Sequence, residues 1–195
     1  GGMPLITYAE AVARIAGEER GAGWLPHCER EGIFQLPTAE WADAIAGTIA
    51  PLGAERPLEV GAGSGVFGRA LIERGVSIRL TDPAGAGDVE PLGVAEALER
   101  HRPDLVLSCW LPIDLGAEKI IFAHPGVRWY LAVVQTGPRF TGSEALWADH
   151  GWRSRRIEAA DRWSVSRSDF LSGVDRGEHV HHGAAFLFER TNYHN

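Results

Sequence analysis

Three glycines at alternate positions, Gly61, Gly63 and Gly65, follow the short apolar segment 58–60 and precede an apolar pattern of helical spacing. Glycine lets the backbone take positive φ angles there and removes side chains that would block a ligand. The helix after such a turn directs its unpaired N–H groups and its positive dipole end toward whatever lies above the turn. The pattern therefore predicts a site for a nucleotide-like or carboxylate-bearing cofactor.

Two further groups of chemically capable residues follow predicted strands. Asp82 comes after the alternating segment 76–81, about 20 residues beyond Gly61, where a carboxylate can accept hydrogen bonds from two ribose hydroxyls. Ser108, Cys109 and Trp110 end the next clear strand, 104–108. Ligands of open α/β sheets bind at the carboxyl ends of strands, so we expect these residues near the cofactor. The Trp110 ring either stacks on a flat or cationic substrate or packs in the core.

The histidines of the segment 178–183 allow two interpretations. On a strand, His179 and His181 would point to the same face, which is compatible with a metal site completed by His124 or Asp114. No acid or cysteine at close ligand spacing completes that set, so we favour a polar loop and predict no metal site. The catalytic residues stay unknown, with His181 and His124 as candidates for a general base.

The elements that must position these residues alternate along the chain. Helices are expected to begin at the capping residues Thr7 and Thr38, after the glycine turn, and near Gly93. Further helical segments are predicted around 119–122 and from Ser143 through Trp147. The predicted strands are 58–60, 76–81, 104–108, 129–134, 153–159 and 184–189. Strands that alternate with helices predict a parallel sheet, and the last two strands predict an antiparallel edge.

Two segments are predicted to lack regular structure. Residues 21–37 are rich in glycine, proline and charge, yet they contain Trp24 and Phe34, so they either pack at the domain edge or form a lid. Residues 166–182 are polar and predict a long linker. Residues 84–87 leave little room for a helix and a full strand after Asp82.

The segment from Glu59 to Gly65 resembles motif I of the class I S-adenosylmethionine-dependent methyltransferases, which reads acid, any, Gly, any, Gly, any, Gly. The resemblance extends over roughly residues 38–190 and implies a three-layer, Rossmann-like α/β sandwich. Its sheet would be mostly parallel, with six or seven strands, an antiparallel last strand and a shortened third strand and helix. We expect one domain overall, with an N-terminal helix and candidate lid at 1–37 and a cofactor-binding part at 38–195.

The resemblance also implies roles for individual residues. Glu59 and the backbone of the turn would hold the amino-acid end of S-adenosylmethionine, Asp82 the ribose, and Asp88 the adenine amino group. The cofactor site would then comprise Glu59, Gly61, Ala62, Gly63, Gly65, Asp82, Asp88, Ser108 and Cys109. Trp110 and Pro112 would line the substrate pocket. The segment 109–112 lacks the acid or amide that amine methyltransferases carry there, so that amine chemistry is not supported.

The expected function is methyl transfer from S-adenosylmethionine to an oxygen, nitrogen or carbon atom of a small molecule by in-line displacement, leaving S-adenosylhomocysteine. One alternative is a non-catalytic or repurposed domain that binds this cofactor. A second is an NAD-dependent oxidoreductase, because Gly63, Gly65 and Gly68 also fit the dinucleotide spacing G-x-G-x-x-G. Gly61 lies two residues too early for that register, and the chain lacks a dehydrogenase's usual second domain.

Composition and net charge indicate which kinds of binding partner to expect. The net charge of −7 and the lack of a basic stripe argue against nucleic acid and favour a small-molecule acceptor. Cys28 and Cys109 lie far apart without a C-x-x-C pair, which suits a reducing cytoplasm and argues against a disulfide scaffold. No apolar run reaches about 18 residues, so no membrane partner is expected. The sequence does not predict the oligomeric state.

Overall fold

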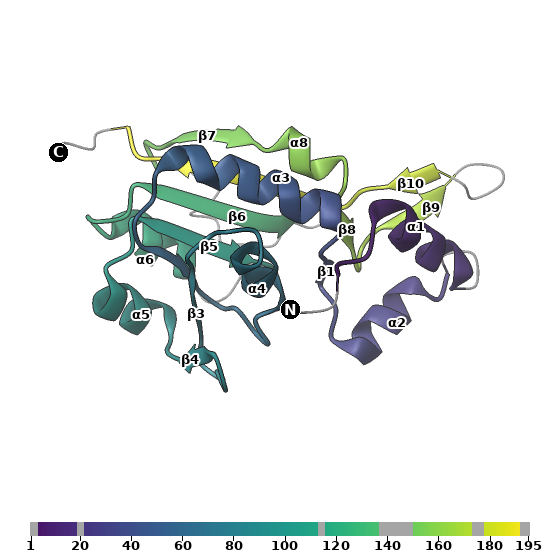
Figure 1. Ribbon diagram of the computed structural model, residues 1–195, viewed down its shortest axis with the longest axis horizontal. Helices are drawn as coiled ribbons and strands as arrows, with labels where there is room; N and C mark the ends of the chain where they lie inside the picture. Colours follow the sequence, from purple (N-terminus) through teal and green to yellow (C-terminus); the bar gives the residue numbers. More distant parts are fainter. Residues whose placement is uncertain (1–3, 19–21, 113–115, 137–149, 173–177, 192–195) are drawn as a thin grey trace.

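The computed structural model (Figure 1) describes residues 4–18, 22–112, 116–136, 150–172 and 178–191. Its main sheet has seven strands in the order β4-β3-β2-β5-β6-β11-β7. β2, β3, β4, β5 and β6 pair in parallel, whereas β11 runs antiparallel to both β6 and β7. The bounds are β2 (Pro57–Glu59), β3 (Arg79–Asp82), β4 (Val89–Pro91), β5 (Leu105–Cys109), β6 (Trp129–Gln135), β7 (Arg153–Arg156) and β11 (Gly183–Glu189).

This is the expected Rossmann-like sandwich with an antiparallel late strand. The third strand is present as the short β4, which follows β3 without a helix between them, as the short 84–87 segment predicted. β6 is buried along most of its length, as a continuous apolar run in a sheet covered on both faces should be.

Helices cover both faces of the sheet. α3 (Ala39–Ile49), which continues into the 3₁₀ turn η2 (Ala50–Leu52), packs on one face with α4 (Val66–Ile72) and α8 (Glu158–Asp161). α5 (Val94–His101) and α6 (Ala117–Ala123) pack on the other. Alternate residues of β6 divide between the two cores: Leu131 faces the first and Tyr130 the second. The sheet is thus held between two separate apolar layers.

A small second unit, here called the capping module, combines segments from both halves of the chain. α1 (Tyr8–Gly17), α2 (Trp24–Glu31) and β1 (Gln35–Leu36) pack with β8 (Val165–Ser166), β9 (Phe170–Ser172) and β10 (Glu178–Val180). β1 pairs with β8, and β9 pairs with β10. In Figure 1 the module lies at the end of the sheet to which β5 and β6 point. The module therefore borders the carboxyl edge of the sheet, where ligands of such folds bind.

The capping module corrects two predictions. The sequence predicts a loop over 21–37, but this segment contains α2. Trp24 and Cys28, four residues apart, bury one face of the helix, and Gly32 at φ 68° ends it. The sequence predicts a linker over 166–182, but β9 and β10 pair there as an antiparallel ladder. The N-terminal segment shares its core with residues of this ladder, and its movement as a lid stays a prediction.

The end of the sheet differs from expectation in one detail. The strand predicted over 153–159 stops at Arg156, and α8 follows directly. All four residues of β7 are exposed, so the arginines there form a solvated edge. The helix predicted from Ser143 through Trp147 lies outside the described residues. Among the described helices, none combines the length and apolar character that a membrane span requires.

Candidate functional site

The glycine turn joins the carboxyl end of β2 to α4. Gly61, Gly63 and Gly65 have φ angles of 61°, 59° and 88°, which confirms the predicted left-handed backbone. The turn is tied to the neighbouring strand because the Ala62 N–H donates to the Thr81 carbonyl at 2.9 Å. The backbone conformation is therefore fixed by the sheet and depends on glycine.

The three glycines meet different surroundings. A Cβ on Gly61 would lie 2.4 Å from Cδ2 of Leu111, and one on Gly65 would lie 2.6 Å from Nη1 of Arg69. At Gly63, no described heavy atom comes within 4 Å of that position. Two glycines thus make room for the protein itself, and Gly63 presents exposed backbone that a ligand can approach.

Asp82, at the end of β3, is held beside the exposed backbone of Gly63. Its Oδ2 accepts the Gly63 N–H at 2.9 Å, and its Oδ1 accepts the Ala84 N–H at 2.9 Å. A carboxylate has about four acceptor positions, so each oxygen keeps capacity for a further donor. The geometry suits the predicted role in holding two ribose hydroxyls.

Glu59 lies behind the turn, beneath α4. The residue is 1% exposed, and its Oε1 has no hydrogen-bond partner among the described residues. Burial raises the pKa of this carboxyl to about 8, although the Gly68 N–H and the positive charge of Arg69 oppose the shift. A buried oxygen without a partner is costly, so a donor or cation placed there would stabilise the site.

Asp88 stands at the rim of the turn. Its Oδ1 accepts a hydrogen bond from Nη1 of Arg69 at 2.8 Å, and Arg69 also donates to the Ser64 carbonyl. Both side chains are partly exposed to solvent. Arg69 thus links the turn to Asp88, whose contact with adenine stays a prediction.

The end of β5 carries residues with three different environments. The hydroxyls of Ser108 and Tyr130 lie 2.6 Å apart in the core that faces α5 and α6, so the Ser108 side chain does not point at the turn. Part of Cys109 is exposed, but its thiol is buried. This burial and the negative charge of Glu59 raise the pKa of the thiol. Pro112 is exposed. Direct contact of these residues with cofactor or substrate stays a prediction.

Trp110 has an unusual backbone. Its φ of 60° places a bulky residue in the left-handed region, where strain is expected. The ring is 9% exposed and belongs to the core, and its Nε1 donates to Oε1 of Gln35 at 3.1 Å. The ring therefore packs between the sheet and the capping module, and a substrate contact would involve only its exposed edge.

The histidines lie in a cluster that the sequence did not predict. Asp169 lies ten residues before His179, and its Oδ2 accepts a hydrogen bond from Nε2 of His179 at 2.8 Å. The Tyr8 hydroxyl lies 2.7 Å from Nδ1 of His179 and 3.4 Å from Nε2 of His181. Burial and, secondarily, the charge of His179 lower the pKa of His181. An acid does complete the set, although no sequence spacing marked it.

His124, a further ligand considered from the sequence, is not part of this cluster. His124 follows α6 at the amino edge of the sheet, and its Nε2 lies 3.4 Å from Oε1 of Glu99. His124 therefore lies at the opposite edge of the sheet from the glycine turn and is not placed to act as a base there. Asp114 lies outside the described residues.

A hydrogen-bonded chain connects the cluster to the end of β5. Nδ1 of His181 donates to the Ser164 carbonyl at 2.9 Å, and Nε2 of Gln35 donates to the Ser164 hydroxyl at 2.9 Å. The other end of the Gln35 amide accepts from Trp110. The cluster and the end of β5 are thus linked through Ser164, which accepts one hydrogen bond on its carbonyl and another on its hydroxyl.

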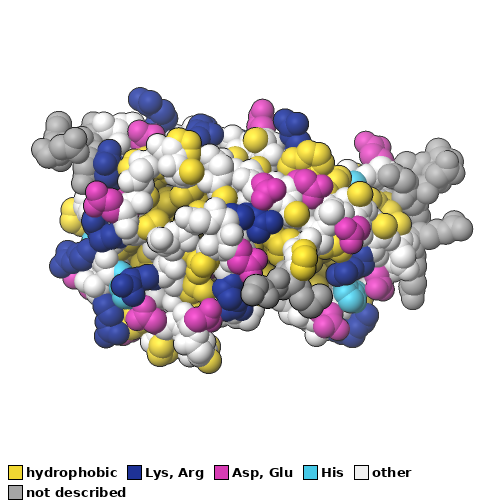
Figure 2. All heavy atoms as spheres, in the orientation of Figure 1, with side chains coloured by type: hydrophobic (Ala, Val, Ile, Leu, Met, Phe, Trp, Pro, Cys, Tyr) yellow, Lys and Arg dark blue, Asp and Glu magenta, His cyan; other side chains and the backbone are white. Residues whose placement is uncertain are grey.

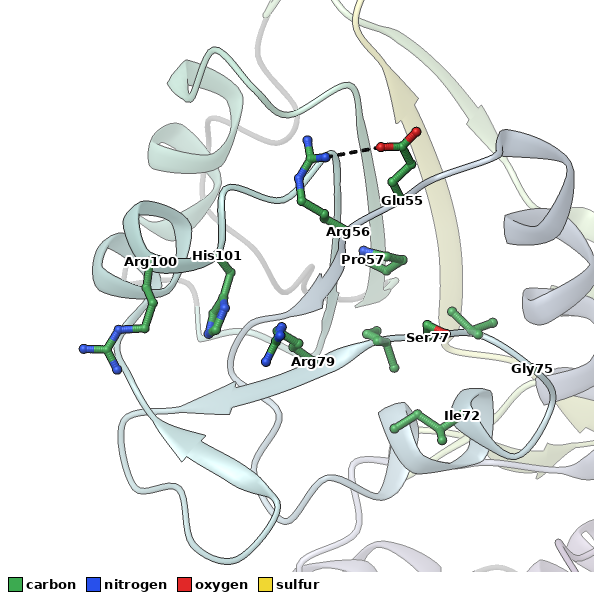
Figure 3. Close-up of a pocket in the computed structure, with 11 residues that line it drawn as sticks. Glu55, Arg56, Pro57, Ile72, Gly75, Ser77, Arg79, Arg100 and His101 are labelled. Carbon is green, nitrogen blue, oxygen red and sulfur yellow. Dashed lines mark hydrogen bonds and ion pairs between the residues drawn. The ribbon is translucent and has the colours of Figure 1, made fainter.

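A separate cavity of about 680 Å³ lies at the opposite edge (Figure 3). Arg79 at the start of β3 and Arg100 and His101 at the end of α5 line it, together with Arg56, which pairs with Glu55. The amino ends of β2 and β3 form its wall, so this cavity is not the site at the glycine turn.

The sheet order, the antiparallel β11 and the glycine turn give the chain the fold of the class I S-adenosylmethionine-dependent methyltransferases. No family model matches the chain. No curated protein matches it either.

Several solved structures are similar in fold at low sequence identity. The methyltransferase domain of bacterial CtHen1 has 11% identity and a TM-score of 0.46, over 78% of this chain and 97% of that one. An O-methyltransferase family protein from Burkholderia thailandensis has 11% identity and a TM-score of 0.47, over 93% of this chain and 63% of that one. The magnesium protoporphyrin IX methyltransferase from Synechocystis has 11% identity and a TM-score of 0.42, over 78% and 79%. The similarity to these structures is one of fold.

Proposed function

We propose that the protein transfers a methyl group from S-adenosylmethionine to an oxygen, nitrogen or carbon atom of a small molecule, by in-line displacement. The observation that carries the proposal is the exposed backbone at Gly63, in the turn after β2. It lies beside the carboxylate of Asp82, which ends β3 and accepts the Gly63 N–H. When bound, the cofactor supplies a methyl group on a sulfonium, which is electrophilic without further activation.

The chain's own residues would bind and orient. Asp82 accepts hydrogen bonds from ribose hydroxyls with the capacity that its two backbone donors leave free. Glu59 lies behind the turn, where its unpartnered oxygen would favour a positively charged amino group. Holding nucleophile, methyl carbon and sulfur in line is the main catalytic task, so no single catalytic side chain is required.

The acceptor would lie between the end of β5 and the capping module. Phe34 of the module is 49% exposed, its ring centroid lies 6.1 Å from that of Trp110, and the guanidinium of Arg167 covers its face at 3.7 Å. An apolar wall with a cation beside it suits a small, partly apolar molecule with a negative or polar group. Figure 2 shows acidic and basic side chains interspersed over the face drawn, which supports a small molecule over nucleic acid.

The first test is calorimetric titration of the full chain with S-adenosylhomocysteine. We expect binding by the wild type and its loss in Gly63→Arg, because the new side chain fills the space of the ligand. Gly53→Arg is the matched control, since Gly53 also has a positive φ and no described atom within 4 Å of its Cβ position, but lies at the other edge. No heat from the wild type at tens of micromolar, or equal loss in both variants, would contradict the proposal.

The second test follows labelled methyl groups from S-adenosylmethionine into a fractionated extract of small molecules. Appearance of the label in a small molecule supports methyl transfer if the labelling requires Asp82. Tight binding of S-adenosylhomocysteine with no labelled product would favour the alternative of a cofactor-binding domain without transfer. Stabilisation by NADH but not by S-adenosylhomocysteine would favour the nicotinamide alternative.

A further inference from the structure

Three side chains with metal-binding chemistry converge inside the capping module. Asp169 follows β8, His179 lies on β10, and His181 follows β10. One ligand atom from each residue lies within 4.8 Å of the others. The Asp169 side chain is fully buried, and that of His179 is 5% exposed. The fold thus brings two imidazoles and a carboxylate together away from bulk solvent.

The two imidazoles have more lone pairs than the neighbouring groups have protons to donate to them. The Ser164 carbonyl can only accept, so Nδ1 of His181 carries a proton and its Nε2 carries a lone pair in the neutral ring. His179 donates from Nε2 to Asp169, which leaves a lone pair on Nδ1. Tyr8 has one hydroxyl proton and faces both lone pairs. The cluster therefore has acceptor capacity that a cation would use.

Surrounding groups hold the cluster in place as outer partners of a metal site do. Oδ1 of Asp169 accepts from the Ser166 hydroxyl at 2.8 Å and the His182 N–H at 2.8 Å, and Oδ2 accepts from the Ser166 N–H at 3.0 Å. The Ser164 carbonyl orients the His181 ring. Such partners fix ring orientation and carboxylate position in metal sites.

We propose that Oδ2 of Asp169 and the Nε2 atoms of His179 and His181 bind one divalent transition-metal ion, with the Tyr8 hydroxyl beside it. The ion takes the place of the proton that Nε2 of His179 shares with Asp169, and that proton moves to Nδ1 of His179, which faces the Tyr8 oxygen. Imidazole nitrogen with one carboxylate suits Zn²⁺, Fe²⁺, Co²⁺ and Ni²⁺, whereas Mg²⁺ prefers oxygen ligands and retained water. The hydrogen-bonded chain through Ser164 and Gln35 connects this site to the end of β5. Any effect of the ion on a methyl acceptor rests on the proposed function, whereas metal binding itself does not. A failure to bind metal and a failure to transfer methyl groups can therefore be told apart.

The test uses the full chain, stripped with a chelator and dialysed, and titrated with Zn²⁺ or Co²⁺ alone. We expect one ion per chain by calorimetry and metal analysis, a Co²⁺ absorption spectrum with nitrogen ligation, and no comparable binding of Mg²⁺. His179→Ala and His181→Gln should each weaken Zn²⁺ binding by more than about 100-fold, beyond the 10–100-fold typical of outer partners. His27→Ala is the matched control within the same module and should bind as the wild type does.

A readout on the wild type avoids dependence on the folding of the variants. Cu²⁺ and ascorbate oxidise residues next to a bound copper ion, and mass spectrometry of peptides then locates the site. We expect oxidation in the peptide that carries His179 and His181. A wild type that takes up neither Zn²⁺ nor Co²⁺, oxidation at other peptides, or undiminished Zn²⁺ binding in both cluster variants would overturn the proposal.

Discussion

Replacing Glu59 with glutamine tests how the carboxyl behind the glycine turn is accommodated. Glu59→Gln keeps the shape of a protonated carboxyl but cannot ionise. Because burial raises the pKa of Glu59 in the folded protein, the folded state binds a proton that the unfolded state releases. The free energy of unfolding of the wild type should therefore fall as pH rises through this range, and the variant should lack that contribution.

The size of the effect follows from the two pKa values. The pKa is about 8 in the folded protein against an ordinary value of 4.5. At about 1.4 kcal/mol per pH unit, the wild type loses at most about 5 kcal/mol between those pH values. At or below pH 4.5, the wild type and Glu59→Gln should be about equally stable, and near pH 8 the variant should be the more stable protein.

Urea unfolding, followed by tryptophan fluorescence at intervals from pH 5 to pH 8.5, measures this difference. Other titrating groups are common to both proteins, so they cancel in the difference between the two free energies. Glu73→Gln makes the same chemical change on an exposed side chain and serves as the control. A difference between wild type and Glu59→Gln that stays constant across the pH range would refute the reasoning.

Four further substitutions test packing and hydrogen bonding, each by its free energy of urea unfolding. Gly68→Ala in α4 should destabilise by about 1–3 kcal/mol, because its Cβ would lie 2.1 Å from Cδ2 of Leu80. Gly47→Ala in α3, where no described atom comes within 4 Å, should instead stabilise by up to about 1 kcal/mol, and equal signs for the two would contradict the argument. Trp24→Ala should cost about 3–5 kcal/mol, because the ring is fully buried and its Nε1 donates to the Ser166 carbonyl, and a loss under about 1 kcal/mol would show that the capping module core is not cooperative with the rest. Asp104→Asn should cost about 1–3 kcal/mol, because its two oxygens accept the Glu55 and Arg56 N–H groups at 2.7 and 2.8 Å and an amide nitrogen cannot accept, and an unchanged unfolding midpoint would exclude this role.

The sequence predicted the parts of the fold that depend on local patterns. The buried strand β6 carries a continuous apolar run, and the Thr38 side chain accepts the Trp41 N–H, as its place before a helix predicts. The positive φ angles of the glycine turn follow from residue type alone. The helix α2 was missed because only Trp24 and Cys28 mark its buried face amid polar and charged residues.

The parts of the site that were missed depend on contacts between distant segments. Asp169 reaches His179 through a tight turn and an antiparallel ladder whose three-residue strands are too short to show a period. Tyr8 joins the same cluster from the other end of the chain. The left-handed backbone of Trp110 also has no signal in its residue type, because tryptophan does not favour that conformation.

The composition of the capping module from both halves of the chain has a consequence for synthesis. α1 and α2 leave the ribosome before the parallel strands, but Val165 and Leu171, which complete the core around Trp24, emerge after those strands have been made. Until then, the apolar face of α2 has only α1 and the neighbouring N-terminal residues to pack against. The core around Trp24 therefore stays incomplete until Val165 and Leu171 have been made, and the capping module borders the carboxyl edge of the sheet only after that.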